Sequence, residues 1–196
     1  GGHVAGALPT ALNAYEMFAQ PRLAYVLFGV EPELDCHHPQ QALAALKQAA
    51  LVVMLTPFKS DAALQYADAI LPVSPYTETA GTFINTEGRV QSFNGVVKPR
   101  GETRPAWKLL RVLGNVLNLP GFEYQTSEEV RNEVLGATTE FANGLDNALN
   151  AAAITVPAAV KPGLQRIADV PIHFADAMAR RAPALQKTAD ARAPQL

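Results

Sequence analysis

Apolar residues in the first 75 positions fall into three short runs separated by segments of helical spacing. Leu23 to Gly29 and Leu51 to Leu55 are near-continuous apolar runs rich in β-formers, which is typical of strands buried on both faces of a sheet. Ala69 to Leu71 is a shorter run that ends at Pro72. These three runs predict three strands.

Helical patterns connect and flank these runs. Thr10 is placed to cap a helix reaching Gln20, Pro39 suits the first turn of a helix ending near Ala50, and Asp61 to Tyr66 predicts a short helix. The order strand–helix–strand–helix–strand with short connections predicts a parallel sheet with right-handed crossovers. This is half of a doubly wound α/β domain, and we expect the other half to come from sequence that precedes Gly1.

The remainder of the chain predicts a hairpin, two helices and an extended tail. A Gly-punctuated hairpin follows Glu78, and a helix runs from Arg104-Pro105 to Asn118. The Thr-x-x-Glu spacing at Thr126 predicts a capping box and a helix with Val130, Val134, Phe141, Leu145 and Leu149 on one face. Residues 150–163 indicate a linker, and Ile167 to Ile172 a short extended stretch. We therefore divide the chain into a Rossmann-like α/β part (1–118) and a helical and extended appendage (119–196).

Composition and charge exclude several classes of function. A net charge of −2 gives no electrostatic reason to expect a nucleic-acid partner. No apolar stretch reaches the roughly 18 residues of a spanning helix, so we expect no direct membrane insertion. Cys36 is the only cysteine, which rules out an internal disulfide or a four-thiolate cluster. His37 and His38 invite a metal interpretation, but adjacent residues are a poor chelate, and a solvated loop is the favoured one.

The hairpin carries the densest group of polar candidates, namely Glu78, Asn85, Glu87 and Arg89. Two carboxylates on one hairpin suit acid–base chemistry if burial separates their pKa values. A structural interpretation is favoured, because no nucleophile or metal-ligand cluster accompanies them: Glu87 or Glu78 accepts from Arg89, and Asn85 satisfies turn amides. Gly81 and Gly88 then provide backbone freedom at the two ends of the hairpin.

The same segment resembles a known family signature. Ala67-Asp68-x-x-Leu71-Pro72 followed by Glu78-x-x-Gly81-Thr82-x-x-Asn85 resembles the motif of the molybdopterin oxidoreductase superfamily. Within it, the run from Thr86 to Gln91 is similar to the family of large (75 kDa) iron–sulfur subunits of NADH:quinone oxidoreductase (complex I). The Asp-x-x-x-Arg-Arg-x-x-x-Leu-Gln pattern at 176–186 is similar to the carboxy-terminal element of that family. Catalytic molybdenum enzymes more often carry a second arginine where this protein has Gly88.

This resemblance implies a fragment of an electron-transferring oxidoreductase, NADH:quinone oxidoreductase, that is itself non-catalytic. The family's iron–sulfur clusters lie in an amino-terminal region outside this sequence, so no cofactor is expected here and the segment is a scaffold. Implied partners are other peripheral-arm subunits of complex I, at the cytoplasmic side of the bacterial inner membrane. If a pterin were bound, the residues implied by the motif are Glu78, Gly81, Thr82, Asn85, Glu87 and Arg89.

Two other hypotheses remain open at this point. The first is a catalytic molybdopterin enzyme of the formate dehydrogenase or nitrate reductase type, in which the hairpin lines the pterin cleft. Against it, the loops after Gly29 and Leu55 carry acidic residues and prolines, which suit phosphate poorly. The second is a stand-alone α/β domain that binds a small ligand and has no redox role.

Overall fold

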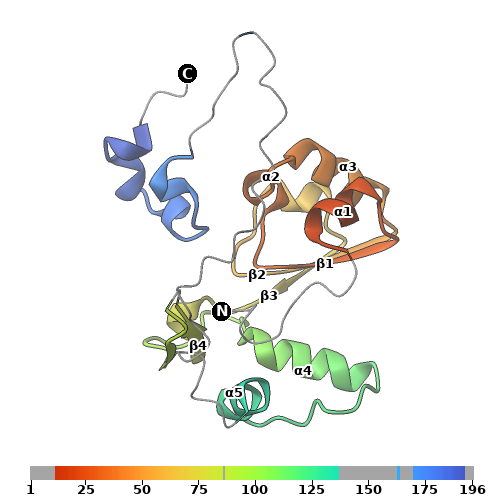
Figure 1. The fold of residues 1–196 in the computed structure, drawn as a ribbon, viewed down its shortest axis with the longest axis vertical. Coiled ribbons are helices and arrows are strands. Elements are labelled where there is room, and N and C mark those ends of the chain that lie inside the picture. Colours follow the sequence, from red (N-terminus) through yellow and green to blue (C-terminus); the bar gives the residue numbers. More distant parts are fainter. Residues whose placement is uncertain (1–11, 86, 137–162, 164–169, 193–196) are drawn as a thin grey trace, which may run out of the picture. The chain divides into compact units, whose positions relative to one another are not determined.

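The computed structural model describes residues 12–85, 87–136, 163 and 170–192. The chain divides into two compact units, residues 1–147 and 148–196, and each is described by itself. Figure 1 labels most of the elements of the first unit. In sequence order they are α1 (Ala14–Ala19), β1 (Ala24–Phe28), α2 (Pro32–Asp35), α3 (Pro39–Gln48), β2 (Leu51–Thr56), the 3₁₀ turn η1 (Ala63–Gln65), β3 (Ala69–Pro72), the 3₁₀ turn η2 (Tyr76–Glu78), β4 (Gly81–Ile84), β5 (Val90–Phe93), α4 (Ala106–Val116) and α5 (Ser127–Leu135).

The first three strands form a parallel sheet in the order β1-β2-β3. Ala24 lies opposite Leu51, and Val53 lies opposite Ala69. The apolar runs of the sequence therefore correspond to the three strands, and the predicted α/β class with a parallel Rossmann-like sheet and flanking helices is confirmed. Our prediction that β3 stops before Pro72 is wrong by one residue, because Pro72 is the last residue of the strand.

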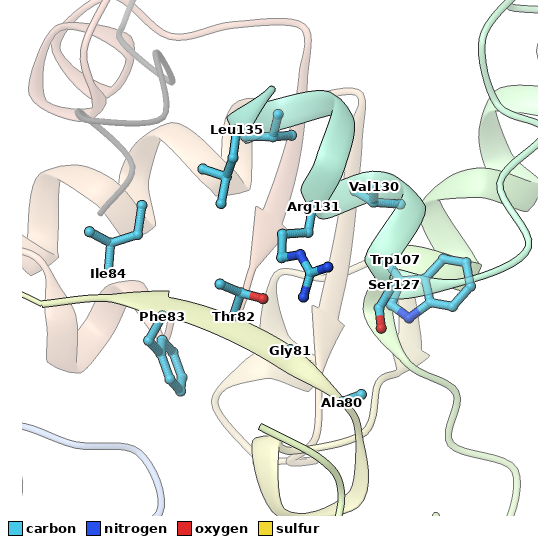
Figure 2. A pocket seen from close by; sticks show the side chains of 11 residues that line it. Ala80, Gly81, Thr82, Phe83, Ile84, Trp107, Ser127, Val130, Arg131 and Leu135 are labelled. Carbon is cyan, nitrogen blue, oxygen red and sulfur yellow. The ribbon is translucent and has the colours of Figure 1, made fainter. Parts of the chain in front are cut away.

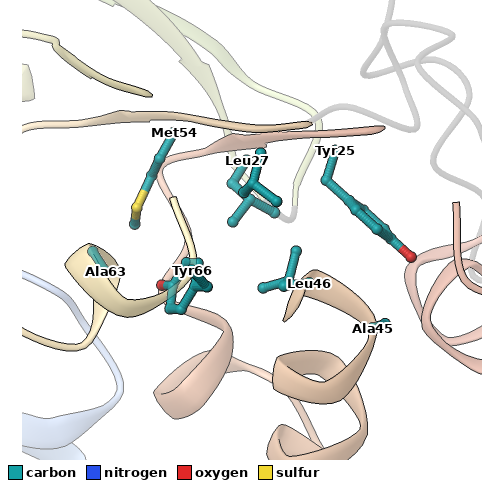
Figure 3. Close-up of a cluster of buried hydrophobic side chains, with 8 residues drawn as sticks. Tyr25, Leu27, Ala45, Leu46, Met54, Ala63 and Tyr66 are labelled. Carbon is teal, nitrogen blue, oxygen red and sulfur yellow. The ribbon is translucent and has the colours of Figure 1, made fainter. Parts of the chain in front are cut away.

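The hydrophobic core lies on one face of this sheet. Figure 3 shows side chains of β1 and β2 pointing toward α3 and the turn around η1. The buried cluster consists of Tyr25, Leu27, Ala45, Leu46, Val52, Met54, Ala63 and Tyr66. On the other face of β1, Val26 is 62% and Phe28 54% exposed. The expectation that β1 is buried on both faces is therefore wrong for the described part of the chain, whose helices cover this strand on one side.

The helices begin where local hydrogen bonds fix them. α1 starts after Asn13, whose side chain accepts from the amide of Glu16 while the Glu16 carboxylate accepts from the amide of Asn13. The predicted cap Thr10 lies outside the described residues. α3 begins at Pro39 as predicted, and the predicted helix at 61–66 is the single 3₁₀ turn η1. The short helix α2, which is separated from β1 by three residues, was not among the predicted elements.

The hairpin and α4 follow the sheet. β4 and β5 pair antiparallel, which confirms the predicted hairpin. The amide of Ser74 donates to the carbonyl of Arg104 (2.9 Å), so the segment before α4 lies beside the end of β3. α4 occupies most of its predicted range and ends at Val116. Asn118, two residues later, has a φ of 54° and so adopts the left-handed conformation common after helices.

α5 is shorter than predicted. It ends at Leu135, and Gly136 follows with φ 61° and donates its amide to the carbonyl of Asn132 (2.9 Å). The predicted stripe residues Phe141, Leu145 and Leu149, and the linker apart from Gly163, lie outside the described residues. The predicted capping box is only half formed. The Thr126 hydroxyl accepts from the backbone amide of Glu129 (3.2 Å), as in a capping box. The Glu129 carboxylate, however, accepts from the backbone amide of Gln125 (2.6 Å) and not from that of Thr126.

The second unit is described over residues 163 and 170–192 and contains only 3₁₀ turns in that range. They are η4 (Ile172–Phe174), η5 (Ala179–Arg181), η6 (Leu185–Lys187) and η7 (Asp190–Arg192). The predicted extended stretch is wrong at Ile172, which starts a turn after Pro171; Ile167 lies outside the described residues. The boundary that we placed after residue 118 stays a prediction.

Polar side chains of the tail pattern hold these turns together. Asp176 Oδ1 accepts from the amides of Met178 (2.9 Å) and Ala179 (2.8 Å). Gln186 Nε2 donates to the carbonyls of His173 and Ala179, both at 3.0 Å. In the described parts of both units, we find no helix with the length and apolar character needed to cross a bilayer.

Candidate functional site

The six residues predicted to surround a pterin do not converge on one site. Gly81 and Thr82 lie on β4 and line a cavity of about 530 Å³. Glu78 lies in η2 and lines a different cavity of about 470 Å³. Asn85, Glu87 and Arg89 lie at the tip of the hairpin and are not among the lining residues of either cavity.

The hairpin tip is organised by Asn85. Its Oδ1 accepts from the backbone amides of Glu87 (3.0 Å) and Arg89 (2.9 Å), which confirms the predicted role in satisfying turn amides. Glu87 Oε2 lies 3.9 Å from Arg89 Nη2, and both side chains are about 70% exposed. An ion pair this exposed contributes little free energy, and the burial that the acid–base interpretation invoked is absent at Glu87.

Glu78 has a different partner from the one we considered. Its carboxylate accepts from the backbone amide of Arg100 (2.9 Å) and lies 3.5 Å from the hydroxyl of Thr103. The carboxylate that pairs with Arg89 is therefore Glu87, and the alternative of Glu78 is wrong. Glu78 instead fastens the segment that leads from the hairpin to α4.

The two hairpin glycines have different reasons to be glycine. Gly88 has φ 74°, so it supplies the backbone freedom that we predicted. Gly81 is not among the described glycines with positive φ, and a Cβ built on it would lie 2.7 Å from Cζ of Phe93. Gly81 therefore leaves room for the Phe93 ring, which also stacks on Phe83 with ring centroids 4.9 Å apart. The prediction of backbone freedom at Gly81 is wrong.

The Asp68 position of the family motif has a structural role that the sequence analysis did not identify. Asp68 Oδ2 accepts from the backbone amide of Val52 (2.7 Å), and the Asp68 amide donates to the carbonyl of Val52 (2.9 Å). These reciprocal hydrogen bonds fasten the start of β3 to the start of β2. The sequence offered one signal for this role, namely an acidic residue immediately before a predicted strand.

The carboxyl ends of β1 and β2 are where a sheet of this kind offers donors to a phosphate. After β1, the amide of Glu31 donates to the carboxylate of Asp35 (2.7 Å). After β2, the amide of Phe58 donates to the Thr56 hydroxyl (3.1 Å), and the amide of Ala63 to the Ser60 hydroxyl (3.1 Å). These three backbone donors, one after β1 and two after β2, are thus already bound by the protein's own side chains.

The loop after β1 is also electrostatically negative. Glu31 is buried, Glu33 accepts from the Tyr66 hydroxyl (2.9 Å), and Asp35 lies on the same short helix. Burial and the neighbouring carboxylates raise the pKa of both Tyr66 and Cys36 above their ordinary values. A phosphate would be repelled by the loop after β1, and the two amides named above are already bound in the loop after β2, so neither loop suits the phosphates of a pterin dinucleotide.

Metal ligation finds no support in the described part of the chain. No group of three His, Cys, Asp or Glu side chains there is placed to hold an ion. His37 and His38 are exposed, and their ring centroids lie 4.4 Å apart in an edge-on arrangement. The solvated-loop interpretation of this pair is therefore confirmed.

A cavity between β4 and α5 is the largest apolar space that we describe, and the sequence analysis did not predict it. Figure 2 shows Arg131, Leu135 and Val130 of α5 on one side and β4 on the other, with Trp107 of α4 nearby. Arg131 Nη1 donates to Ser92 Oγ (3.1 Å), and Ser92 Oγ lies 3.0 Å from Thr82 Oγ1. A single hydrogen-bond network thus joins α5 to both strands of the hairpin.

Comparison with known proteins places this α/β architecture among the oxidoreductases. The model of the Molybdopterin oxidoreductase family matches residues 5–116, more than half of the chain. The chain therefore belongs to the molybdopterin oxidoreductase family.

Two relatives indicate two branches of this family. The chain is 35% identical over 109 residues to the F420-dependent formate dehydrogenase 1 subunit alpha of Methanococcus maripaludis, which is 55% of this chain and 16% of the relative. It is 48% identical over 58 residues to the mitochondrial NADH-ubiquinone oxidoreductase 78 kDa subunit of Candida albicans, which is 30% of this chain and 8% of the relative. The chain thus spans less than a fifth of the length of these two curated relatives.

Proposed function

We propose that this chain is part of the large iron–sulfur subunit of a respiratory NADH:quinone oxidoreductase and serves there as a scaffold without a redox centre of its own. The observation that carries the proposal is the chemistry at the carboxyl ends of β1 and β2. Side-chain oxygens already accept from amides in both loops, and carboxylates crowd the loop after β1. The 48% identity over 58 residues to a 78 kDa complex I subunit supports the same branch.

In this proposal the electron-transfer groups belong to other regions of a longer polypeptide. The α/β unit completes a folded domain and presents its outer surfaces to neighbouring peripheral-arm subunits. The complex lies on the cytoplasmic side of the bacterial inner membrane, and this segment reaches the membrane only through its partners.

A catalytic enzyme of the formate dehydrogenase type is the second candidate. A specific observation favours it, because the alignment to a formate dehydrogenase subunit extends over 109 residues, nearly twice the length of the complex I alignment. In that case the phosphate-binding amides of the cofactor site would have to come from segments other than the two loops described above.

Activity of the native assembly separates the two candidates. The full-length protein would be tagged in its own organism, purified under non-denaturing conditions and assayed with NADH and a quinone analogue, and separately with formate and an artificial acceptor. We expect NADH-dependent quinone reduction and no formate oxidation. Formate oxidation without NADH oxidation would overturn the proposal in favour of the second candidate.

A further inference from the structure

The cavity between β4 and α5 has the size and lining of a small-molecule site. Its volume of about 530 Å³ falls within the roughly 300–1,000 Å³ common for such sites. Its walls are mostly apolar, and a single charged side chain contributes to them (Figure 2). The apolar side chains are Ala80, Phe83, Ile84, Trp107, Val130, Val134 and Leu135.

Arg131 provides the charged group. Its Nη1 donates to Ser92 Oγ (3.1 Å), while Nε and Nη2 donate to Asn132 Oδ1 (3.2 and 3.0 Å). Both acceptors are neutral, and within the described residues Arg131 forms no ion pair. A guanidinium has five N–H donors, so one donor on each terminal nitrogen remains for a further acceptor. Figure 2 shows this group extending from α5 toward β4.

Glu128 is an acidic neighbour of Arg131 on the same helix. Glu128 lies one turn before Arg131 and lines a small adjoining cavity of about 200 Å³, but it does not line the apolar cavity. The pKa of Glu128 is lowered mainly by hydrogen bonds from the backbone and Ser127, and Arg131 contributes less. Arg131 therefore faces the apolar cavity without a bound carboxylate in the described structure.

We propose that this cavity binds a small amphiphilic carboxylate. The apolar body lies between β4 and α5, where it removes apolar walls from water. The carboxylate accepts two hydrogen bonds from the terminal nitrogens of Arg131, in the two-pronged geometry that guanidinium offers to a planar anion. This site goes beyond the proposed function, since it requires neither a redox centre nor a partner subunit.

The protein carries its own reporter for this site. Trp107 lines the cavity and is the only tryptophan in the sequence. Its fluorescence would be followed while the 196-residue chain is titrated with decanoate, octanoate or decylammonium below their micellar concentrations. We expect saturable binding of decanoate, roughly tenfold weaker binding of octanoate because two buried CH₂ groups are lost, and no saturable response to decylammonium.

Two arginine variants test the head-group contact. Arg131→Gln is expected to weaken decanoate binding by about tenfold or more, since it removes a charge-assisted pair. Arg89→Gln is the matched control, because Arg89 is an exposed hairpin arginine outside the cavity, and decanoate binding should not change. Arg131→Lys retains the charge without the two-pronged donor and should give an intermediate affinity, which keeps the test valid if the glutamine variant does not fold.

Three results would overturn the proposal: no saturable response to decanoate, equal affinity for decylammonium, or unchanged affinity in the folded Arg131 variants. None of these results bears on the NADH and formate assays, so the two proposals fail separately.

Discussion

The carboxylate of Asp68 accepts a hydrogen bond from the backbone amide of Val52, at 2.7 Å. Val52 is the second residue of β2 and is 1% exposed, so its amide would otherwise be buried without that partner. The aspartate of the Ala-Asp-x-x-Leu-Pro pattern thus links the start of β3 to β2 by a hydrogen bond. This part of the family motif has a role in folding that requires no cofactor.

Asp68→Ala should lower the free energy of unfolding by about 1–3 kcal/mol, the cost of leaving a buried amide without an acceptor. Asp68→Asn keeps an acceptor oxygen and should lose less. Urea unfolding followed by circular dichroism would measure both. Asp61→Ala is the matched control, because Asp61 is exposed like Asp68 but, within the described residues, its carboxylate accepts no hydrogen bond from a strand amide. Equal stability of the Asp68→Ala and Asp61→Ala variants would contradict this role.

The Tyr66–Glu33 hydrogen bond predicts sensitivity to alkaline pH. Burial and the adjacent carboxylates raise the pKa of Tyr66 in the folded state above its ordinary value of about 10. The folded protein therefore holds this proton at a pH where the unfolded chain loses it. The resulting stabilisation is fully present below about pH 10 and is lost as the pH rises above that value.

Tyr66→Phe should remove this alkaline decline and should cost about 1 kcal/mol at pH 7 for the lost hydrogen bond. The measurement is urea unfolding at pH 7, 9 and 11. Tyr76→Phe serves as a control, since Tyr76 is 54% exposed. The account fails if the wild-type protein and Tyr66→Phe lose stability in parallel between pH 9 and 11.

The hairpin tip should depend on Asn85 and not on the ion pair beside it. Asn85→Ala removes the acceptor of two turn amides and should destabilise the protein by about 1 kcal/mol. Glu87→Gln should change stability by less than about 0.5 kcal/mol, because its contact with Arg89 is long and exposed. Thermal unfolding of both variants would show which of them loses more stability. A larger loss of stability for Glu87→Gln than for Asn85→Ala would contradict the role given to Asn85.

Gly114 of α4 should resist replacement although alanine favours helices. A Cβ at this position would overlap the ring of Phe122. Alanine contributes about 1 kcal/mol of helix propensity, whereas overpacking costs about 1–3 kcal/mol, so Gly114→Ala should destabilise the protein slightly. Asn115→Ala, at an exposed position of the same helix, should be neutral or stabilising. If Gly114→Ala raised the melting temperature as Asn115→Ala does, the Phe122 contact would be excluded.

The sheet could be predicted from the sequence because strand and helix signals were local. The apolar run at 23–29 follows Pro21-Arg22, and the run at 51–55 is closed by Thr56-Pro57. The helical pattern between the two runs indicates a crossover and therefore parallel pairing, which the structure has. The one-sided burial of β1 could not be predicted, since the sequence shows that Val26 and Phe28 are apolar but not whether an element covers their face of the sheet. Helix α2 was missed because four residues give no periodicity.

The candidate site was predicted less well because it depends on contacts between distant residues. Asn85 and Glu87 could be interpreted locally, as turn chemistry acts over a few positions. The hydrogen bond between Arg131 and Ser92 joins residues 39 positions apart, and no local sequence pattern around either residue predicts it. Gly88 is weaker evidence for the complex I branch than the sequence alone indicated. Its φ of 74° favours glycine at this position for conformational reasons that are independent of catalysis.

The most direct test of the scaffold assignment is the molybdenum and tungsten content of the full-length protein, purified from its own organism and measured by mass spectrometry against protein concentration. The account predicts far less than one equivalent of either metal per polypeptide, with iron present from the rest of the subunit. About one equivalent of molybdenum or tungsten per polypeptide would contradict it.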